Sequence, residues 1–138
     1  MPRKEILKGK TILLVTQQDS LRKQITRSIQ HQKPYLIEAV QPQDAIFHLM
    51  AKNPDLIIYD DKMPPFQSNK LLSVLKRAKP HTRVLLIAEA GAPQRSIDVS
   101  AQGVAYTLPA DANDQQIYNA VKHCLSIGSV PRVETAQT

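Results

Sequence analysis

Residues 54–65 read PDLIIYDDKMPP, and this stretch decides the fold. Three apolar residues and a tyrosine lead directly into Asp60 and Asp61, and the chain then turns at two prolines. A short apolar run between turn residues predicts a strand that is covered on both faces, and sheets of such strands place their chemistry at the carboxyl ends of the strands. Two interpretations of the aspartates are open at this point: they form a metal or phosphoryl site, or they solvate a loop.

The length and composition indicate one soluble domain. The chain has 138 residues, enough for one core, and it contains no apolar run of about 18 residues that could cross a membrane. The first ten residues, MPRKEILKGK, lack the pattern of a signal peptide, so we expect a cytoplasmic protein with no membrane partner. The single cysteine, Cys124, excludes an intramolecular disulfide and is interpreted as a small packing residue.

The formal net charge of +6 allows three interpretations: binding to nucleic acid, binding to an acidic partner, or solubility. The lysines and arginines are spread along the sequence, without interleaved aromatic residues and without a recognised nucleic-acid-binding motif. This distribution favours a solvated basic surface and disfavours a nucleic-acid partner.

Apolar runs alternate with helical patterns along the chain. Strands are predicted at 11–15, 35–40, 56–59, 83–88 and 104–108, and helices at 20–29, 42–52, 68–78 and 93–102, with a last helix capped by Asn113. This alternation predicts an α/β fold with a five-stranded parallel sheet and helices on both faces. We place the domain at residues 10–127, after an N-terminal extension at 1–9 and before a C-terminal tail or linker at 128–138.

Over residues 10–126 the chain resembles the receiver domain of two-component response regulators, which has the flavodoxin-like (βα)5 fold. PDLIIYDDKMPP is similar to the family pattern of an apolar third strand, a phosphoacceptor aspartate and a Met-Pro turn three residues later. The stretches ILLVTQQDSLRK and GVAYTLPADA add to the resemblance. It implies a CheY-like protein of signal transduction with Asp60 at the phosphoacceptor position and Asp61 and Lys62 near the site.

The resemblance also implies a site that has lost most of its chemistry. Receivers hold Mg²⁺ with acidic residues after the first strand, and they contact the phosphoryl group with a hydroxyl after the fourth strand and a lysine after the fifth. The corresponding residues here are neutral: Thr16, Gln17, Ala88 and Ala110. We therefore expect no bound metal, no cofactor and no catalytic residue. Asp60 is expected to accept a hydrogen bond from Gln17 or to pair with Lys62, and Asp19 is expected to cap the first helix.

The leading hypothesis is a degenerate receiver, or pseudo-receiver, which is not an enzyme and acts by protein–protein interaction. The alternative is a working phosphoreceiver of a phosphorelay, in which Asp60 is phosphorylated by a sensor histidine kinase with Mg²⁺. A third possibility is nucleic-acid binding through the basic surface. By analogy with receivers, a sensor kinase or an output domain would bind the face of the fourth helix, fifth strand and fifth helix, where Arg95, Tyr106 and Tyr118 are the candidate contacts.

Overall fold

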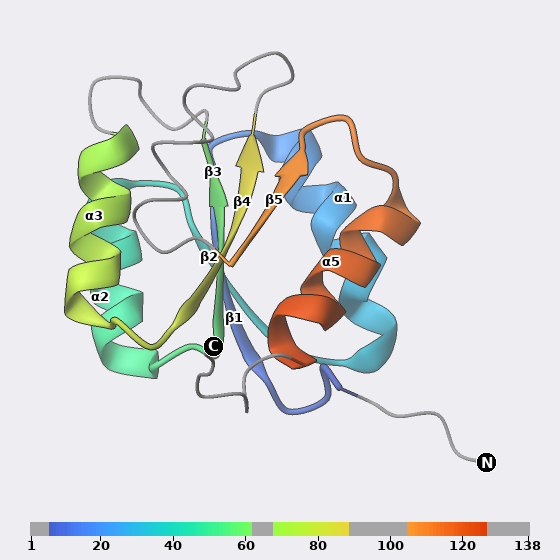
Figure 1. The fold of residues 1–138 in the computed structure, drawn as a ribbon, viewed down its shortest axis with the longest axis horizontal. Helices are drawn as coiled ribbons and strands as arrows, with labels where there is room; N and C mark the ends of the chain where they lie inside the picture. Colours follow the sequence, from blue (N-terminus) through green and yellow to red (C-terminus); the bar gives the residue numbers. More distant parts are fainter. Residues whose placement is uncertain (1–5, 62–67, 89–104, 127–138) are drawn as a thin grey trace, which may run out of the picture.

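A parallel sheet of five strands forms the centre of the structure, a computed structural model that describes residues 6–61, 68–88 and 105–126 (Figure 1). The spatial order is β2-β1-β3-β4-β5, and each neighbouring pair is parallel. The strands are β1 (Thr11–Val15), β2 (Tyr35–Ala39), β3 (Leu56–Asp60), β4 (Arg83–Ala88) and β5 (Tyr106–Pro109). The predicted fold class is confirmed.

Helices cover both faces of this sheet. They are α1 (Asp19–Ile29), the short 3-10 helix η1 (Gln30–Gln32), α2 (Pro42–Lys52), α3 (Ser68–Ala78) and α5 (Asp114–Ser126). Figure 1 shows α2 and α3 on one face and α1 and α5 on the other. The helix predicted at 93–102 and the tail at 128–138 lie outside the described residues.

The apolar run in β3 is explained by burial on both faces. Leu56 and Ile58 pack in the cluster beneath α1 and α5, whereas Ile57 and Tyr59 pack in the cluster beneath α2 and α3. Because both faces of the strand are covered, it reads as a continuous apolar stretch rather than an alternating one. Cys124 lies in the first cluster, where burial raises the pKa of its thiol to about 11.

Core packing extends to Leu7, which precedes residue 10. Leu7 is fully buried in the cluster beneath α1 and α5, and its backbone N–H donates a hydrogen bond to Gln32 Oε1 at 3.0 Å. A single buried leucine gives no periodic signal, which is why the sequence did not reveal it. Strand β5 also starts two residues later than predicted.

Of the two helix caps predicted from the sequence, one is confirmed and the other is wrong. Asn113 does cap α5: its Oδ1 accepts from the Gln116 N–H at 2.8 Å, and its own N–H donates to Gln116 Oε1 at 2.9 Å. The prediction for Asp19 is wrong, because Asp19 is the first residue of α1 and forms ion pairs with Arg22 and Lys23. The N-cap residue is Gln18, whose side chain makes no capping hydrogen bond.

No helix in the described parts of the chain is long and apolar enough to cross a membrane.

Candidate functional site

The carboxyl ends of the strands gather at one edge of the sheet, the upper edge in Figure 1. The register brings the ends level: Val15 pairs with Tyr59, Asp60 with Ile87, and Ala88 with Pro109. The residue after β1, Thr16, therefore lies beside Asp60 at the end of β3. The predicted site residues of β1, β3 and β4 come together as the fold requires.

Asp60 is buried at this edge, with 2% of its surface exposed, and the chain itself supplies hydrogen-bond donors to it. Thr16 Oγ1 donates to Asp60 Oδ2 at 2.6 Å, and Gln18 Nε2 donates to the same oxygen at 2.8 Å. The Gln18 backbone N–H also donates to Thr16 Oγ1 at 3.0 Å. These three residues form a closed network, which we call the Thr16–Gln18–Asp60 network.

Of the two adjacent glutamines after β1, the one that donates a hydrogen bond to Asp60 is not the one expected from the sequence. Gln17 is exposed, and the next residue, Gln18, bonds Asp60. The connection from β1 to α1 turns Gln17 outward, because α1 starts at Asp19 and Gln18 is its N-cap residue. The position of this turn could not be read from two adjacent glutamines. The expected partner Lys62 lies outside the described residues.

Asp61, expected near the site, and the two remaining degenerate positions, Ala88 and Ala110, also lie at this edge. Asp61 is buried beside Asp60, and its N–H donates to the Ile87 carbonyl at 2.9 Å. Ala88, with 6% of its surface exposed, ends β4 and offers only a methyl group. Ala110 follows the end of β5, and its N–H donates to the Ala88 carbonyl at 2.9 Å. Pro109, which pairs with Ala88 in the sheet, is also uncharged. Ala110, the residue expected at the position of the receiver lysine, therefore carries no charge.

The side chains at the carboxyl edge of the sheet are a poor set of ligands for Mg²⁺. Mg²⁺ requires oxygen ligands close to an octahedron, supplied by carboxylates and water. Asp60 and Asp61 are carboxylates, but the Thr16 hydroxyl directs its proton to Asp60 and Gln17 faces solvent. Among the residues that the structure describes, no group of three or more His, Cys, Asp or Glu side chains could hold a metal ion.

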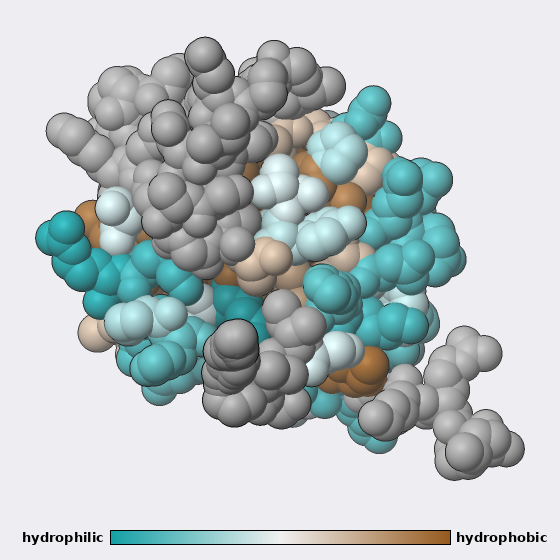
Figure 2. Space-filling model, viewed as in Figure 1, coloured by the Kyte–Doolittle hydropathy of each residue, from teal (hydrophilic) through white to brown (hydrophobic). Residues whose placement is uncertain are grey.

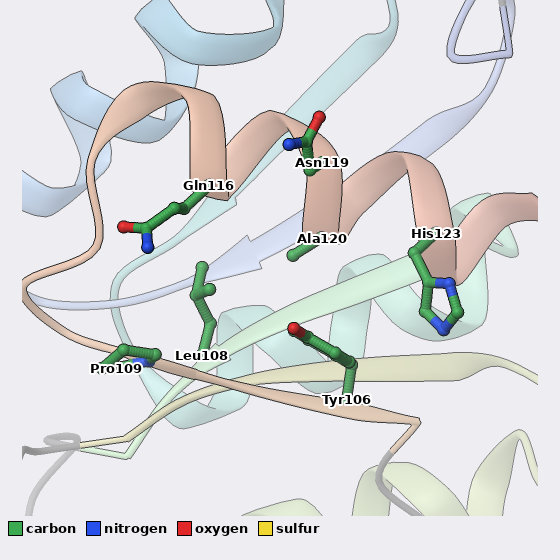
Figure 3. Close-up of a pocket in the computed structure, with 7 residues that line it drawn as sticks. All are labelled: Tyr106, Leu108, Pro109, Gln116, Asn119, Ala120 and His123. Carbon is green, nitrogen blue, oxygen red and sulfur yellow. The ribbon is translucent and has the colours of Figure 1, made fainter.

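A second candidate site lies between β5 and α5, away from Asp60. Tyr106, Leu108 and Pro109 from the strand face Gln116, Asn119, Ala120 and His123 from the helix across a pocket of about 410 Å³ (Figure 3). Tyr106 is 42% exposed, and its ring centroid lies 5.6 Å from that of His123. The described residues of the lining include no carboxylate and no lysine, so they suit a neutral or aromatic surface. We call it the β5–α5 pocket.

Tyr118 does not belong to the β5–α5 pocket. Its hydroxyl accepts a hydrogen bond from Gln32 Nε2 at 2.6 Å, and its ring lies 4.9 Å from that of His31. These contacts direct Tyr118 toward α1 and η1, so Tyr106 and Tyr118 do not form one surface. Arg95 lies outside the described residues. Gln116, Asn119 and His123 were not predicted as part of a candidate site from the sequence. Their spacing, which places them on one face of the last helix, was the only pattern that could have indicated them.

The comparisons with known proteins agree with this fold. Residues 12–122 match the model of the response regulator receiver domain, and the chain belongs to this family. It is similar to the signal receiver domain of a protein described as a Luxo repressor from Vibrio parahaemolyticus, with 20% identity and a TM-score of 0.79 over 87% of this chain and 92% of that one. None of the curated proteins compared with this chain matches it.

Two further solved structures share the fold. A CheY-like receiver domain protein from Methanospirillum hungatei is 14% identical, with a TM-score of 0.80 over 88% of this chain and 97% of that one. The chemotaxis response regulator CheY4 of Vibrio cholerae is 17% identical, with a TM-score of 0.76 over 85% of this chain and 99% of that one. Membership of the receiver family indicates a role in signal transduction.

Proposed function

We propose that this receiver domain transmits signals as a protein-interaction module, a pseudo-receiver that works without Mg²⁺-dependent phosphorylation and without enzymatic activity. One observation carries the proposal: Asp60 Oδ2 accepts hydrogen bonds from both Thr16 and Gln18. These donors come from the connection in which receivers place their acidic metal ligands.

Phosphoryl transfer to an aspartate requires that the charge on the transferred group is neutralised, and preorganised groups of this kind typically supply several kcal/mol of barrier lowering. Thr16, Gln18 and Ala88 are neutral and cannot replace a divalent cation. The donors that hold Asp60 also compete with any attack by its Oδ2 on a phosphodonor. Both effects disfavour an aspartyl phosphate in this site.

The partner, a sensor kinase or an output domain, would bind at the β5–α5 pocket. Tyr106 is exposed there, and tyrosine is among the residue types that most often anchor interfaces. The pocket lies between β5 and α5, and both elements belong to the partner surface expected by analogy with receivers. Its neutral lining would suit an apolar or aromatic side chain of the partner.

A working phosphoreceiver is the second candidate. It is favoured by the position of Asp60, which ends β3 at the carboxyl edge of the sheet beside a second buried carboxylate, Asp61. In that case a kinase partner would have to supply the missing positive charge, or a metal would have to displace Thr16 and Gln18 from Asp60.

Acetyl phosphate with millimolar Mg²⁺ separates the two candidates. We expect the intact mass of the protein to stay unchanged, both in the wild type and in the control variant Asp60→Asn. The triple variant Thr16→Asp/Gln18→Asp/Ala88→Thr places carboxylates at the two positions that contact Asp60 and adds the hydroxyl, and it serves as the positive arm. A gain of one phosphoryl group on wild-type Asp60 would establish the phosphoreceiver and refute the pseudo-receiver.

A further inference from the structure

The start of each strand lies at the edge of the sheet opposite Asp60, the lower edge in Figure 1. We call this the amino edge: the turns that precede β1, β2, β3 and β4, together with the last turns of α2 and α3. Eight cationic residues belong to it: Lys8, Lys10, Lys33, Lys52, Lys76, Arg77, Lys79 and Arg83. The one carboxylate that the described residues place there is Asp55, whose Oδ2 accepts from the Thr11 N–H at 2.8 Å.

The rest of the described chain has the opposite balance. Among the side chains that the structure describes there, four are cationic, those of Arg22, Lys23, Arg27 and Lys122, and seven are acidic, those of Asp19, Glu38, Asp44, Asp60, Asp61, Asp111 and Asp114. The fold therefore concentrates the positive charge on one edge, although the lysines and arginines are dispersed along the sequence. This polarity answers one of the grounds on which the sequence disfavoured a nucleic-acid partner, the dispersal of the cations along the chain.

Within the described residues, no carboxylate pairs with Lys10, Lys33, Lys52 or Arg77 of the amino edge. Lys76 Nζ donates to the carbonyls of Pro80 at 3.0 Å and Thr82 at 2.8 Å, and Lys79 Nζ donates to Asn53 Oδ1 at 2.5 Å. All three acceptors are neutral. On α1, by contrast, Asp19, Glu38 and Asp114 neutralise the cations Arg22, Lys23 and Arg27.

The pKa of Lys76 is consistent with a positive local field. Burial and the neighbouring Arg83 guanidinium hold the pKa of Lys76 below its usual value. A carboxylate close to Lys76 would act in the opposite direction.

The amino edge is broad rather than linear. Lys33 follows η1 on the α1 side of the sheet, whereas Lys52 and Arg77 end α2 and α3 on the other side. Hydrophilic residues cover the lower left of the molecule, where α2 and α3 end (Figure 2). Adjacent strands are about 4.8 Å apart, so the four strands from β2 to β4 extend the charge over roughly 15 Å.

We propose that the amino edge binds the phosphate backbone of duplex nucleic acid without reading its sequence. A duplex presents a dense charge on two strands and matches a broad cationic surface, whereas an extended acidic peptide would cover a single line of it. Tyr35, 67% exposed at the start of β2, lies among these cations and offers an aromatic contact to the sugar–phosphate backbone. Because this surface lies opposite Asp60, the proposal goes beyond the interaction module and does not depend on it.

The test uses the full chain and a fluorescent random-sequence DNA duplex, with affinity measured by anisotropy across a series of salt concentrations. We expect log Kd to vary linearly with the logarithm of the salt concentration. The double variant Lys52→Gln/Arg77→Gln should bind about tenfold more weakly at 0.1 M salt, and the slope of its log Kd against log salt should be smaller by about two. Both side chains are exposed at helix ends, so the variant should keep the melting temperature of the wild type.

The matched control, Lys23→Gln/Arg27→Gln, removes two exposed cations from α1 and should leave the affinity unchanged. Equal losses in both double variants would overturn the proposal, because binding would then follow net charge alone. Poly-glutamate of the same total charge is the competing ligand. If it displaces the duplex at an equal charge concentration, the surface serves an acidic protein segment and the nucleic-acid proposal fails.

Discussion

At the scale of single residues, Asp60 is held by side chains from the connection that follows β1. Thr16 and Gln18 donate hydrogen bonds to Oδ2 from the turn between β1 and α1, so side chains join the ends of two adjacent strands. The hydroxyl is central, because Thr16 Oγ1 both accepts from the Gln18 N–H and donates to Asp60. A buried acceptor that loses such a partner costs free energy.

Thr16→Val removes the hydroxyl while keeping the shape of the side chain. We expect the free energy of unfolding to fall by about 1–3 kcal/mol, since a buried carboxylate oxygen and a backbone N–H each lose a partner. Urea denaturation measures this change. Thr16→Ser keeps the hydroxyl and should lie much closer to the wild type; if Thr16→Val were as stable as the wild type, the network would have no structural role.

At this scale the sequence was only partly informative. It placed Asp60, Thr16 and Ala88 at one site because strand ends follow from the order of elements. It could not tell Gln17 from Gln18, since the choice depends on where α1 begins, and a shift of one residue turns a side chain from the site to the solvent. Element boundaries of this kind depend on tertiary context.

At the scale of elements, the position of α5 depends on its amino-terminal turn and on its contact with α1. Asn113 and Gln116 bond each other's backbone, and Arg27 of α1 contacts Asp114 through Nε and Nη2 at 2.9 and 3.0 Å. Gln24 Nε2 donates to the Ala112 carbonyl at 3.0 Å and so fixes the turn after β5. These contacts orient the helix that forms one side of the β5–α5 pocket.

Asn113→Ala should lower the free energy of unfolding by about 0.5–2 kcal/mol, because the N–H of Gln116 loses its cap. Thermal and urea denaturation measure the loss. Asn113→Asp keeps a capping oxygen and is the matched control, so a similar loss in both variants would argue against a capping role.

The pair of Arg27 and Asp114 predicts a pH dependence. The Arg27 guanidinium, followed by Gln24, holds the pKa of Asp114 below its usual value of 3.8. Since the folded state has the lower pKa, the stabilisation is fully present above pH 3.8 and is lost as the pH falls through the folded value. The melting temperatures of wild type and Asp114→Asn should therefore differ at neutral pH and converge in acid, by a small amount because the pair is exposed. A difference independent of pH would contradict this.

The elements themselves were largely predictable. The bounds of α2 and α3 were predicted to the residue, because Pro42 starts one helix and Pro80 closely follows the other. The start of β5 was placed too early, since a short apolar run does not show which of its residues pair with β4. Leu7 was missed for a related reason, because its burial depends on Gln32 and on the helices that cover it.

At the scale of the whole molecule, the fold separates three surfaces that the sequence mixes. The Thr16–Gln18–Asp60 network lies at the carboxyl edge of the sheet, the β5–α5 pocket lies at the side of β5, and the cations gather at the amino edge. Receivers couple the acceptor aspartate to a partner surface through phosphorylation. In the proposed pseudo-receiver the partner surface acts alone, and this difference can be measured in cells.

Asp60→Asn and Tyr106→Ala should have opposite effects on partner capture from extracts of the native cell. Asp60→Asn keeps an oxygen that can accept from Thr16 and Gln18, so the fold and the captured partner should persist. Tyr106→Ala removes an exposed aromatic side chain from the β5–α5 pocket, and an interface anchor costs about 2 kcal/mol or more when truncated, which weakens binding roughly 30-fold.

Phe47→Ala is the matched control for the loss of an exposed aromatic residue, because Phe47 is 66% exposed on α2, across the sheet from α5. It should retain the partner. A phosphoreceiver would give the reverse result for the aspartate: Asp60→Asn would behave like a deletion of the gene, because the phosphoryl group could no longer be accepted. Capture that survives Tyr106→Ala but fails in Asp60→Asn would therefore reject the interaction module and establish Asp60 as the residue through which this receiver signals.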